Sequence, residues 1–337
     1  MPRLRRTSPD QPGWTRRRAG RGFSYRDADG GRLPDDAVER IRALAIPPAW
    51  QDVWITPFPT GHLQAVGTDA AGRRQYLYHP AWRERRDAEK FERVQRLGRV
   101  LADARGRVLD DLGRSGMPLE RAAAAAVRLI DLGAFRIGND VYADAHGSFG
   151  LTTLERRHVR RRHDALVFSF VGKSGVSHRI EIEDAGVVEA LEVMRRRRTD
   201  DARLLGYRER RWRALLPDLV NAYVQETTGV QATAKDFRTW HGTVTAAVAL
   251  ARAADDPALR PTVAGRRRAV AGAMREVAAH LGNTPALARS SYVDPRVITA
   301  FEQDRTIAAA VRRVRDEEPD VQQAAWERAT LRLLARD

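Results

Sequence analysis

Apolar residues alternate with polar ones in the first part of the chain. Between residues 23 and 78, short runs such as Val53–Ile55 and Leu63–Val66 are separated by glycine- and proline-rich turns, a pattern that favours β-strands. One helix is expected at Asp35–Leu44, because its apolar residues share a face and Pro34 stands near its start. The pattern predicts a small, mostly β domain.

Later in the chain the apolar spacing becomes helical. It predicts a long helix over Arg86–Leu112 and a second over Pro118–Leu132, and nearly all of the chain from about Asp184 onward is expected to be helical. Between these two helices and the segment from Asp184 we expect a hairpin. Its strands are Val167–Val171 and His178–Ile182, joined by a glycine-rich turn that contains Lys173.

These elements indicate an α+β fold with two domains. We expect a flexible basic arm over residues 1–22, because this stretch is rich in arginine and has little apolar periodicity. A small, mostly antiparallel β domain should follow over residues 23–84, and a larger, mostly α domain with a small sheet should occupy residues 85–337.

Composition excludes several classes of protein. Hydrophobic residues make up 43% of the chain, enough for a core, yet no apolar run is long enough to predict a membrane helix. The first residues lack the apolar segment of a secretory signal. The absence of cysteine excludes disulfides, thiolate catalysis and cysteine-based zinc sites, and a reducing cytoplasm is the expected location.

The charge of +15 favours a polyanionic partner, most commonly nucleic acid, although a merely basic soluble protein is the alternative. Nearly all basic residues are arginines, and the lysines are Lys90, Lys173 and Lys235. Either residue supplies a surface charge, but only an amine can be tuned to donate a proton. Lys173 and Lys235 are therefore candidates for chemistry, whereas Lys90 lies in an ordinary polar helix pattern.

No metal-binding motif stands out. The histidines lack zinc-site spacing, and no paired acidic motif typical of two-metal nucleases is present. An enzyme that acts on DNA without an evident metal site must stabilise the phosphorus transition state by other means. Arginines, a lysine and a covalent side-chain nucleophile would suffice.

Five separated segments carry a specific resemblance. They are Gly72–Tyr78, Phe135–Gly138 continuing through Tyr142 to Gly150–Leu154, Phe170–Lys173 followed by Val176–His178, Lys235–Trp240, and Gly282–Pro285 followed by Ser291–Val293. In this order they resemble the poxvirus and bacterial type IB DNA topoisomerases, over roughly residues 22 to 305. The resemblance implies a DNA-binding domain over 23–84 and a catalytic domain over 85–337.

The resemblance also implies catalytic roles. Tyr292 would attack a DNA phosphodiester and form a 3′-phosphotyrosyl link, while Lys173 would protonate the departing 5′ oxygen. Arg136, Arg238 and Asn283 would bind the non-bridging phosphate oxygens, a task that suits arginine forks. Poxviral and eukaryotic members have histidine where Asn283 stands, and asparagine can donate a hydrogen bond but carries no charge.

Further positions resemble DNA contacts of the family. They are Arg73, Arg74, Gln75, Tyr76, Tyr78, Tyr142 and Lys235. The implied partner is double-stranded DNA, held by a monomer whose two lobes close as a clamp, with no cofactor, no ATP and no membrane, and the implied location is the nucleoid. Tyr76 and Tyr78 could equally be outward residues of an ordinary strand.

Local signals place the candidate nucleophile beside Asn283. Gly282 can end one helix, Thr284 and Pro285 can begin a short one, and Asp294 can cap the next. Tyr292 would then lie at a junction between helices.

Two alternatives remain open at this point. A tyrosine recombinase shares the catalytic fold, but usually carries His-x-x-Arg where this chain has Lys235–Arg238. A non-catalytic DNA-binding protein would explain the charge, but not the candidate catalytic set.

Overall fold

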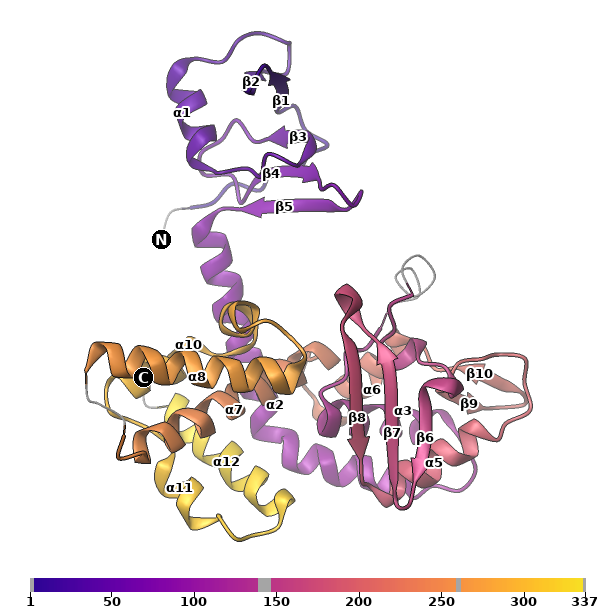
Figure 1. Ribbon diagram of the computed structural model, residues 1–337. Helices are drawn as coiled ribbons and strands as arrows, with labels where there is room; N and C mark the ends of the chain where they lie inside the picture. The colour runs from indigo at the N-terminus through magenta and orange to yellow at the C-terminus, as the bar shows by residue number, and fades with distance from the viewer. Residues whose placement is uncertain (1–2, 139–146, 259–261, 336–337) are drawn as a thin grey trace. The chain divides into compact units, whose positions relative to one another are not determined.

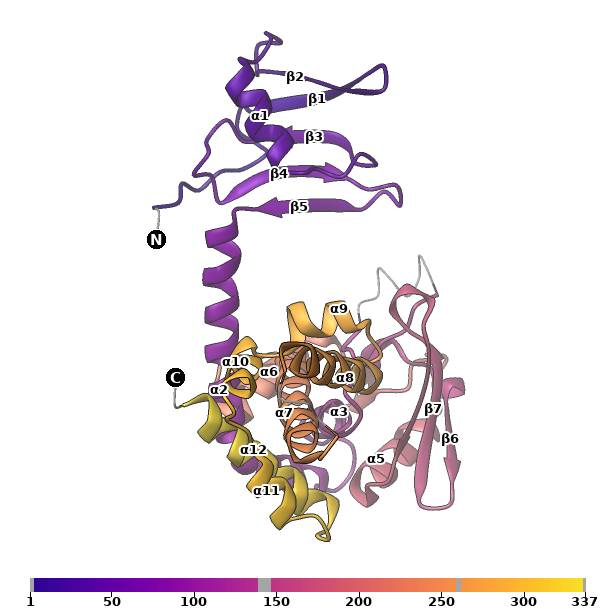
Figure 2. The same cartoon turned by 60° about the vertical axis from the view of Figure 1, so that its left-hand side comes forward.

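The computed structural model describes residues 3–138, 147–258 and 262–335. The chain divides into two compact units, Met1–Lys90 and Phe91–Asp337, which are drawn in two views in Figures 1 and 2. In the described part of the chain, no helix combines the length and the apolar character needed to cross a bilayer.

Unit 1 is an antiparallel five-stranded sheet with one helix (Figure 1). The strands lie in the order β2-β1-β3-β4-β5, and the elements are β1 (Trp14–Ala19), β2 (Gly22–Arg26), α1 (Asp35–Ala43), β3 (Gln51–Ile55), β4 (Leu63–Thr68) and β5 (Arg74–Tyr78). Ile41 of α1 and Ile55 and Ala65 of the sheet form the small core. The expected helix and the expected short strands of this region are confirmed.

The flexible arm expected over residues 1–22 is corrected by the structure for the described residues 3–22. Residues Trp14–Ala19 form β1, which pairs with both β2 and β3. Arg16 explains why the sequence pattern hid this strand, because it occupies a half-buried position normally filled by an apolar residue. Its guanidinium donates to the carbonyls of Ile46, Pro47 and Trp50 at 3.1, 3.0 and 2.6 Å.

The helix α2 (Pro80–Leu112) begins earlier than the expected Arg86 and runs through the division between the units. Its first turn is stabilised by His79, whose Nδ1 accepts a hydrogen bond from the Ala81 amide at 3.1 Å. Histidine is not among the usual N-cap residues, so Pro80 at the first helical position is the start signal that the sequence carries here. The division itself lies after Lys90, rather than near residue 84.

Unit 2 is mostly helical. Its helices are α3 (Leu119–Gly133), α5 (Ala185–Arg195), α6 (Pro217–Thr228), α7 (Ala234–Asp255), α8 (Val263–Leu281), α9 (Pro285–Leu287), α10 (Pro295–Glu302), α11 (Ala308–Arg313) and α12 (Pro319–Leu334). The central helix is α7, which packs against α3, α8, α11 and α12 (Figure 2). The helix α2 also reaches it closely, because Gly98 leaves room for the fully buried Trp240.

A three-stranded antiparallel sheet lies on the side of unit 2 away from α11 and α12 (Figures 1 and 2). It consists of β6 (Val159–Arg162), β7 (Ala165–Val171) and β8 (Ser177–Ile182), and the β7–β8 hairpin matches the expected one. A second hairpin, β9 (Gly206–Arg208) and β10 (Trp212–Ala214), interrupts the stretch expected to be helical. Its strands are only three residues long, too short for their alternation to stand out. The α+β class is confirmed.

Candidate active site

The junction between α8 and α10 holds two of the candidate residues. Helix α8 ends at Gly282, whose φ of +59° suits glycine, and the Asn283 amide donates back to the Ala278 carbonyl at 2.9 Å. The Thr284 side chain caps the short helix α9, which begins with Pro285. This succession of caps was expected from the sequence and is confirmed.

Tyr292 is the last residue of a π-helical turn, Ala288–Tyr292. Wider turns of this kind are rare and often occur at functional sites. The turn is fixed to helix α7 by Thr243, whose hydroxyl shares its proton between the carbonyls of Thr239 at 2.8 Å and Tyr292 at 3.4 Å and accepts from the Asp294 amide at 3.1 Å. The Asp294 side chain then caps α10. The segment that carries Tyr292 is therefore held by hydrogen bonds on both sides.

Arg136 reaches Asn283 from the loop after α3. Its Nη2 donates to the Asn283 Oδ1 at 2.5 Å and to the Gly282 carbonyl at 2.9 Å. These bonds orient both side chains, because the amide oxygen of Asn283 is turned toward the guanidinium. The Asn283 Nδ2 is buried without a hydrogen-bond partner within the described residues. An amide donor left in this way favours an acceptor from outside the protein.

Arg238 of α7 is only 3% exposed. It donates to the carbonyls of Ala134 and Leu281, and its guanidinium carbon lies 5.4 Å from the centre of the Tyr292 ring. Burial and the neighbouring charge of Arg136 lower the pKa of Arg238 to about 10. The group therefore keeps its charge at neutral pH.

Arg136 and Arg238 lie close together without an acidic partner within the described ranges. Three backbone carbonyls take the place of a carboxylate, and all three lie at helix ends. They belong to Ala134 after α3, to Leu281 as the last residue of α8, and to Gly282 after α8. The last carbonyls of a helix lack intrahelical partners and carry partial negative charge, which stabilises cations. The two guanidinium groups still repel each other, so an anion bound between them would relieve that repulsion.

A hollow of about 340 Å³ connects these arginines to the β7–β8 hairpin. Arg136, Arg238, Gly172, His178 and Gly282 are among the residues that line it. Lys173 follows Gly172 on the exposed turn of the hairpin, and its amine has no hydrogen bond or ion pair within the described residues. The structure thus brings together Arg136, Arg238, Asn283 and Tyr292, with the turn that carries Lys173 beside them.

The candidate DNA contacts lie in both units. In unit 1, Arg73 and Gln75 are both tied to Asp69, through an ion pair of 2.8 Å and a hydrogen bond of 2.9 Å. Hydrogen bonds, those from Arg73 above all, lower the pKa of Asp69 to about 2. The other positions are as follows: Arg74 is exposed, Tyr76 is 47% exposed and stacks on Tyr78 at 6.2 Å, Lys235 is exposed in the first turn of α7, and Tyr142 lies outside the described residues.

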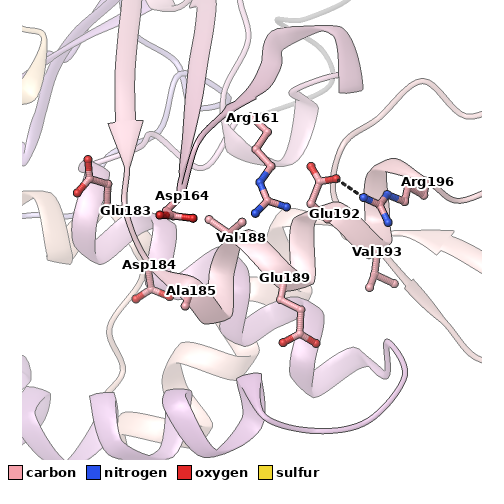
Figure 3. Close-up of a pocket in the computed structure, with 10 residues that line it drawn as sticks. All are labelled: Arg161, Asp164, Glu183, Asp184, Ala185, Val188, Glu189, Glu192, Val193 and Arg196. Atoms are coloured by element: carbon pink, nitrogen blue, oxygen red, sulfur yellow. Dashed lines mark hydrogen bonds and ion pairs between the residues drawn. The ribbon is translucent and has the colours of Figure 1, made fainter.

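A larger hollow of about 530 Å³ is not the candidate site (Figure 3). Five carboxylates are among the residues that line it, namely Asp164, Glu183, Asp184, Glu189 and Glu192. Several of them already have arginine partners, as in the pairs Asp184–Arg128 and Glu192–Arg196 at 2.8 and 3.2 Å. A negative lining repels phosphate. The Asp184–Arg128 pair joins the start of α5 to α3.

Sequence reasoning missed three residues that support the site. His178 lies between the hairpin and the end of α8, Gly242 allows Tyr292 to approach α7, and Thr243 fixes the tyrosine turn. His178 stands in a motif segment and so carried a signal, but the other two did not.

His241, by contrast, is structural, because its Nε2 is 2.9 Å from the buried carboxylate of Asp131. In the described residues, no group of three histidines or acids is arranged to hold a metal ion.

Comparison with known proteins gives two family matches. Residues 79–317 match the model of the eukaryotic DNA topoisomerase I catalytic core, and residues 22–69 match that of the bacterial DNA topoisomerase IB N-terminal domain. The first match alone covers more than half of the chain.

Curated relatives agree with these matches. DNA topoisomerase 1B of Acanthamoeba polyphaga mimivirus is 29% identical over 265 residues, which are 76% of this chain and 77% of the relative. DNA topoisomerase 1B of vaccinia virus (strain Copenhagen) is 28% identical over 113 residues, 34% of this chain and 36% of the relative. DNA topoisomerase 1 of Schizosaccharomyces pombe is 29% identical over 163 residues, 48% of this chain and 19% of the relative. The chain therefore belongs to the type IB DNA topoisomerases, of the poxvirus-like and bacterial kind.

Proposed function

We propose that this protein relaxes supercoiled double-stranded DNA by cutting one strand with Tyr292, allowing the strand to rotate, and resealing it. The observation that carries the proposal is the pair Arg136 and Arg238, two guanidinium groups that meet beside a tyrosine without a carboxylate partner in the described residues. Such a pair suits a phosphate whose charge grows in the transition state.

The chemical step is a transfer of the phosphoryl group to a phenol. The Tyr292 oxygen attacks phosphorus, the bond from phosphorus to the 5′ oxygen breaks, and the phenolic proton passes to solvent. Lys173 gives a proton to the departing 5′ oxygen, which leaves as a hydroxyl. General acid catalysis of this kind is typically worth about 10²- to 10⁴-fold in rate. Religation follows the same path in reverse, and the ester conserves the bond energy, so no ATP is required.

The remaining side chains bind the non-bridging oxygens. Arg136 and Arg238 supply fixed donors, and a hydrogen bond from Asn283 Nδ2 to phosphate would satisfy its buried and otherwise unmatched donor. Because Arg136 and Arg238 are held by backbone and side-chain contacts before substrate arrives, their donors need little reorganisation in the transition state. Asn283 acts here as a neutral donor, not as an acid.

The proposal includes the way in which DNA is held. Unit 1 would contact the major groove through β5 and the turn before it, with Gln75, Tyr76 and Tyr78 near base edges and Arg73 and Arg74 near phosphates. Lys235 and Tyr142 would contact DNA from the catalytic unit. One chain would suffice, with its two units closing around the duplex, and the protein would associate with the nucleoid.

The test is plasmid relaxation by dilute protein with EDTA and without ATP. Wild type should relax the plasmid and leave a covalent protein–DNA adduct after a detergent quench, whereas Tyr292→Phe should do neither. An adduct formed by Tyr292→Phe would refute the assignment of the nucleophile. Binding without any adduct in wild type would favour a non-catalytic DNA-binding protein, and cleavage that requires tetramers on one defined sequence would favour a recombinase.

A further inference from the structure

The His178 ring lies between two segments that are far apart in the sequence. It stacks on Phe170 across the hairpin, with ring centres 5.1 Å apart and planes at 22°. On its edges the ring meets two glycines, Gly172 at the start of the turn that carries Lys173, and Gly282 at the end of α8. The ring therefore contacts both the hairpin turn and the residue beside Asn283.

Neither glycine leaves room for a side chain while the ring is present. A Cβ atom added to Gly172 would lie 2.7 Å from both Cδ2 and Nε2 of His178, and one added to Gly282 would overlap Cε1. Gly172 has a φ of −96°, which any residue can adopt, so only the His178 ring opposes a side chain there. The close fit means that a shift of the ring would move the turn relative to the end of α8.

Arg136 fixes the third side of the ring. Its Nη1 lies 3.5 Å from the His178 Nε2, and a guanidinium has only donors, so a hydrogen bond between them requires the Nε2 lone pair to face Arg136. Burial first, then the charges of Arg136 and Arg238, lower the pKa of His178, so the ring is neutral at neutral pH. A neutral ring can approach two arginines without repulsion and can accept from one of them.

We propose that His178 is a positioning residue, which seats the β7–β8 turn against the Gly282–Asn283 corner and thereby places the Lys173 amine at the leaving 5′ oxygen. The proposal rests on the proposed cleavage by Tyr292. His178 touches neither the nucleophile nor the phosphate in this scheme and acts through Lys173. Its loss should therefore impair protonation of the leaving group more than the grip on the phosphate.

A substrate that needs no proton donor tests this directly. In a DNA strand with sulfur in place of the bridging 5′ oxygen, the leaving group is a thiolate. A thiolate is a far weaker base than an alkoxide, because the pKa of a thiol is about 8.5. On ordinary DNA, His178→Ala should slow single-turnover cleavage about 100-fold, the scale expected for a misplacement of about 1 Å. On the sulfur-containing strand it should cleave within a few-fold of wild type.

Three further variants give the result its meaning. Lys173→Ala should behave like His178→Ala on both substrates, whereas Arg238→Ala should stay slow on both, because its loss affects the phosphate itself. His178→Phe, which keeps a flat ring to stack on Phe170, should retain more activity on ordinary DNA than His178→Ala. Equal losses for His178→Ala on both substrates, or no loss on either, would overturn the proposal.

A double-mutant cycle tests the contact itself. Gly172→Ala should slow cleavage of ordinary DNA in the wild-type background, where the new methyl group strikes the ring. In the His178→Ala background the same change should cost little, because the next atom, Phe170 Cε2, is 3.7 Å away at ordinary contact distance. Additive losses would contradict the contact on which the proposal depends.

A matched control separates this proposal from the proposed function. His163 lies exposed in the turn between β6 and β7 with a φ of +52°, which asparagine tolerates, so His163→Asn should cleave both substrates like wild type. If wild type itself forms no Tyr292-dependent adduct, the proposed function fails. If wild type and His163→Asn form it and His178→Ala does so at the same rate, only the role of His178 fails.

Discussion

Gly242 lies directly beneath Tyr292. A Cβ atom added to this glycine of α7 would stand 2.7 Å from the Tyr292 carbonyl oxygen and 3.3 Å from the Tyr292 Cβ. Gly242 is four residues after Arg238, so the two face the same side of the helix. The absence of a side chain at one position thus allows the candidate nucleophile to rest against the helix that carries one of the phosphate-binding arginines.

Gly242→Ala should push the tyrosine turn away from α7 and slow cleavage. A displacement of about 1 Å can cost about 100-fold in rate, which single-turnover cleavage of a labelled duplex would measure. Gly272→Ala on α8 is the matched control, since its nearest atom is a flexible arginine terminus at 3.7 Å. If Gly242→Ala cleaved DNA at the wild-type rate, the close approach of Tyr292 to α7 would have no bearing on the chemistry.

Arg238→Lys should preserve the charge and lose the function. A lysine cannot donate to two helix-end carbonyls and to phosphate in the planar geometry of a guanidinium. Cleavage should fall about 100- to 1,000-fold, as for other fixed transition-state donors, while duplex affinity changes little. The two quantities are measured by single-turnover cleavage and equilibrium binding, with the exposed Arg107→Lys as control. Parallel losses of affinity and rate would point instead to simple DNA binding.

The protein should lose stability as the pH falls below neutrality. Burial, more than any other cause, lowers the pKa of His62, His158, His178 and His280 below the ordinary value of 6.5, that of His280 to about 4. Between that value and the lower folded-state pKa, the unfolded chain binds more protons than the folded one. The contribution is complete above about pH 6.5 and is lost as the pH falls through the folded-state pKa values.

Thermal unfolding at pH 7.5 and pH 5 would measure this effect. The melting temperature of wild type should be lower at pH 5, and His178→Phe should show a smaller difference because one of the four groups is gone. The exposed His163→Asn should keep the wild-type difference. A melting temperature that rises toward pH 5 would contradict the sign of the shifts.

Arg105 should be essential for the stability of unit 2. Its guanidinium lies between two buried carboxylates, Asp131 of α3 and Glu327 of α12, with ion pairs of 2.7 Å to each. Arg105→Ala would leave both charges without this partner, a change that typically costs about 3–5 kcal/mol. Urea unfolding would measure the loss, against Arg107→Ala, which is exposed on the same helix. Equal stability of the two variants would mean that the buried network contributes nothing net.

Much of the local structure could be predicted from the sequence because it follows from neighbouring residues. The helix α1, the β7–β8 hairpin and the succession of caps around Asn283 depend on turns, caps and periodicity within a few positions. The strand β1 could not be predicted, because Arg16 is satisfied by carbonyls some 30 positions later in the chain. Only the fold reveals that these acceptors exist.

The candidate site divides in the same way. The residues expected to meet the phosphate could be named from motifs, whereas His178, Gly242 and Thr243 could not be assigned a role. Thr243 acts across 49 positions on Tyr292, His178 acts across 42 positions on Arg136, and Gly242 acts through the space that its missing side chain leaves. Sequence periodicity describes neither a distant hydrogen bond nor a close approach.

The carbonyls that hold Arg136 and Arg238 link the phosphate site to the stability of two helices. Each arginine satisfies the open end of a helix, α3 or α8, with the same group that is proposed to grip the phosphate. A substitution at either position would therefore remove a catalytic group and expose a helix end in a single change. Natural selection cannot adjust the rate of DNA cleavage at these two positions without also altering how firmly the enzyme is folded.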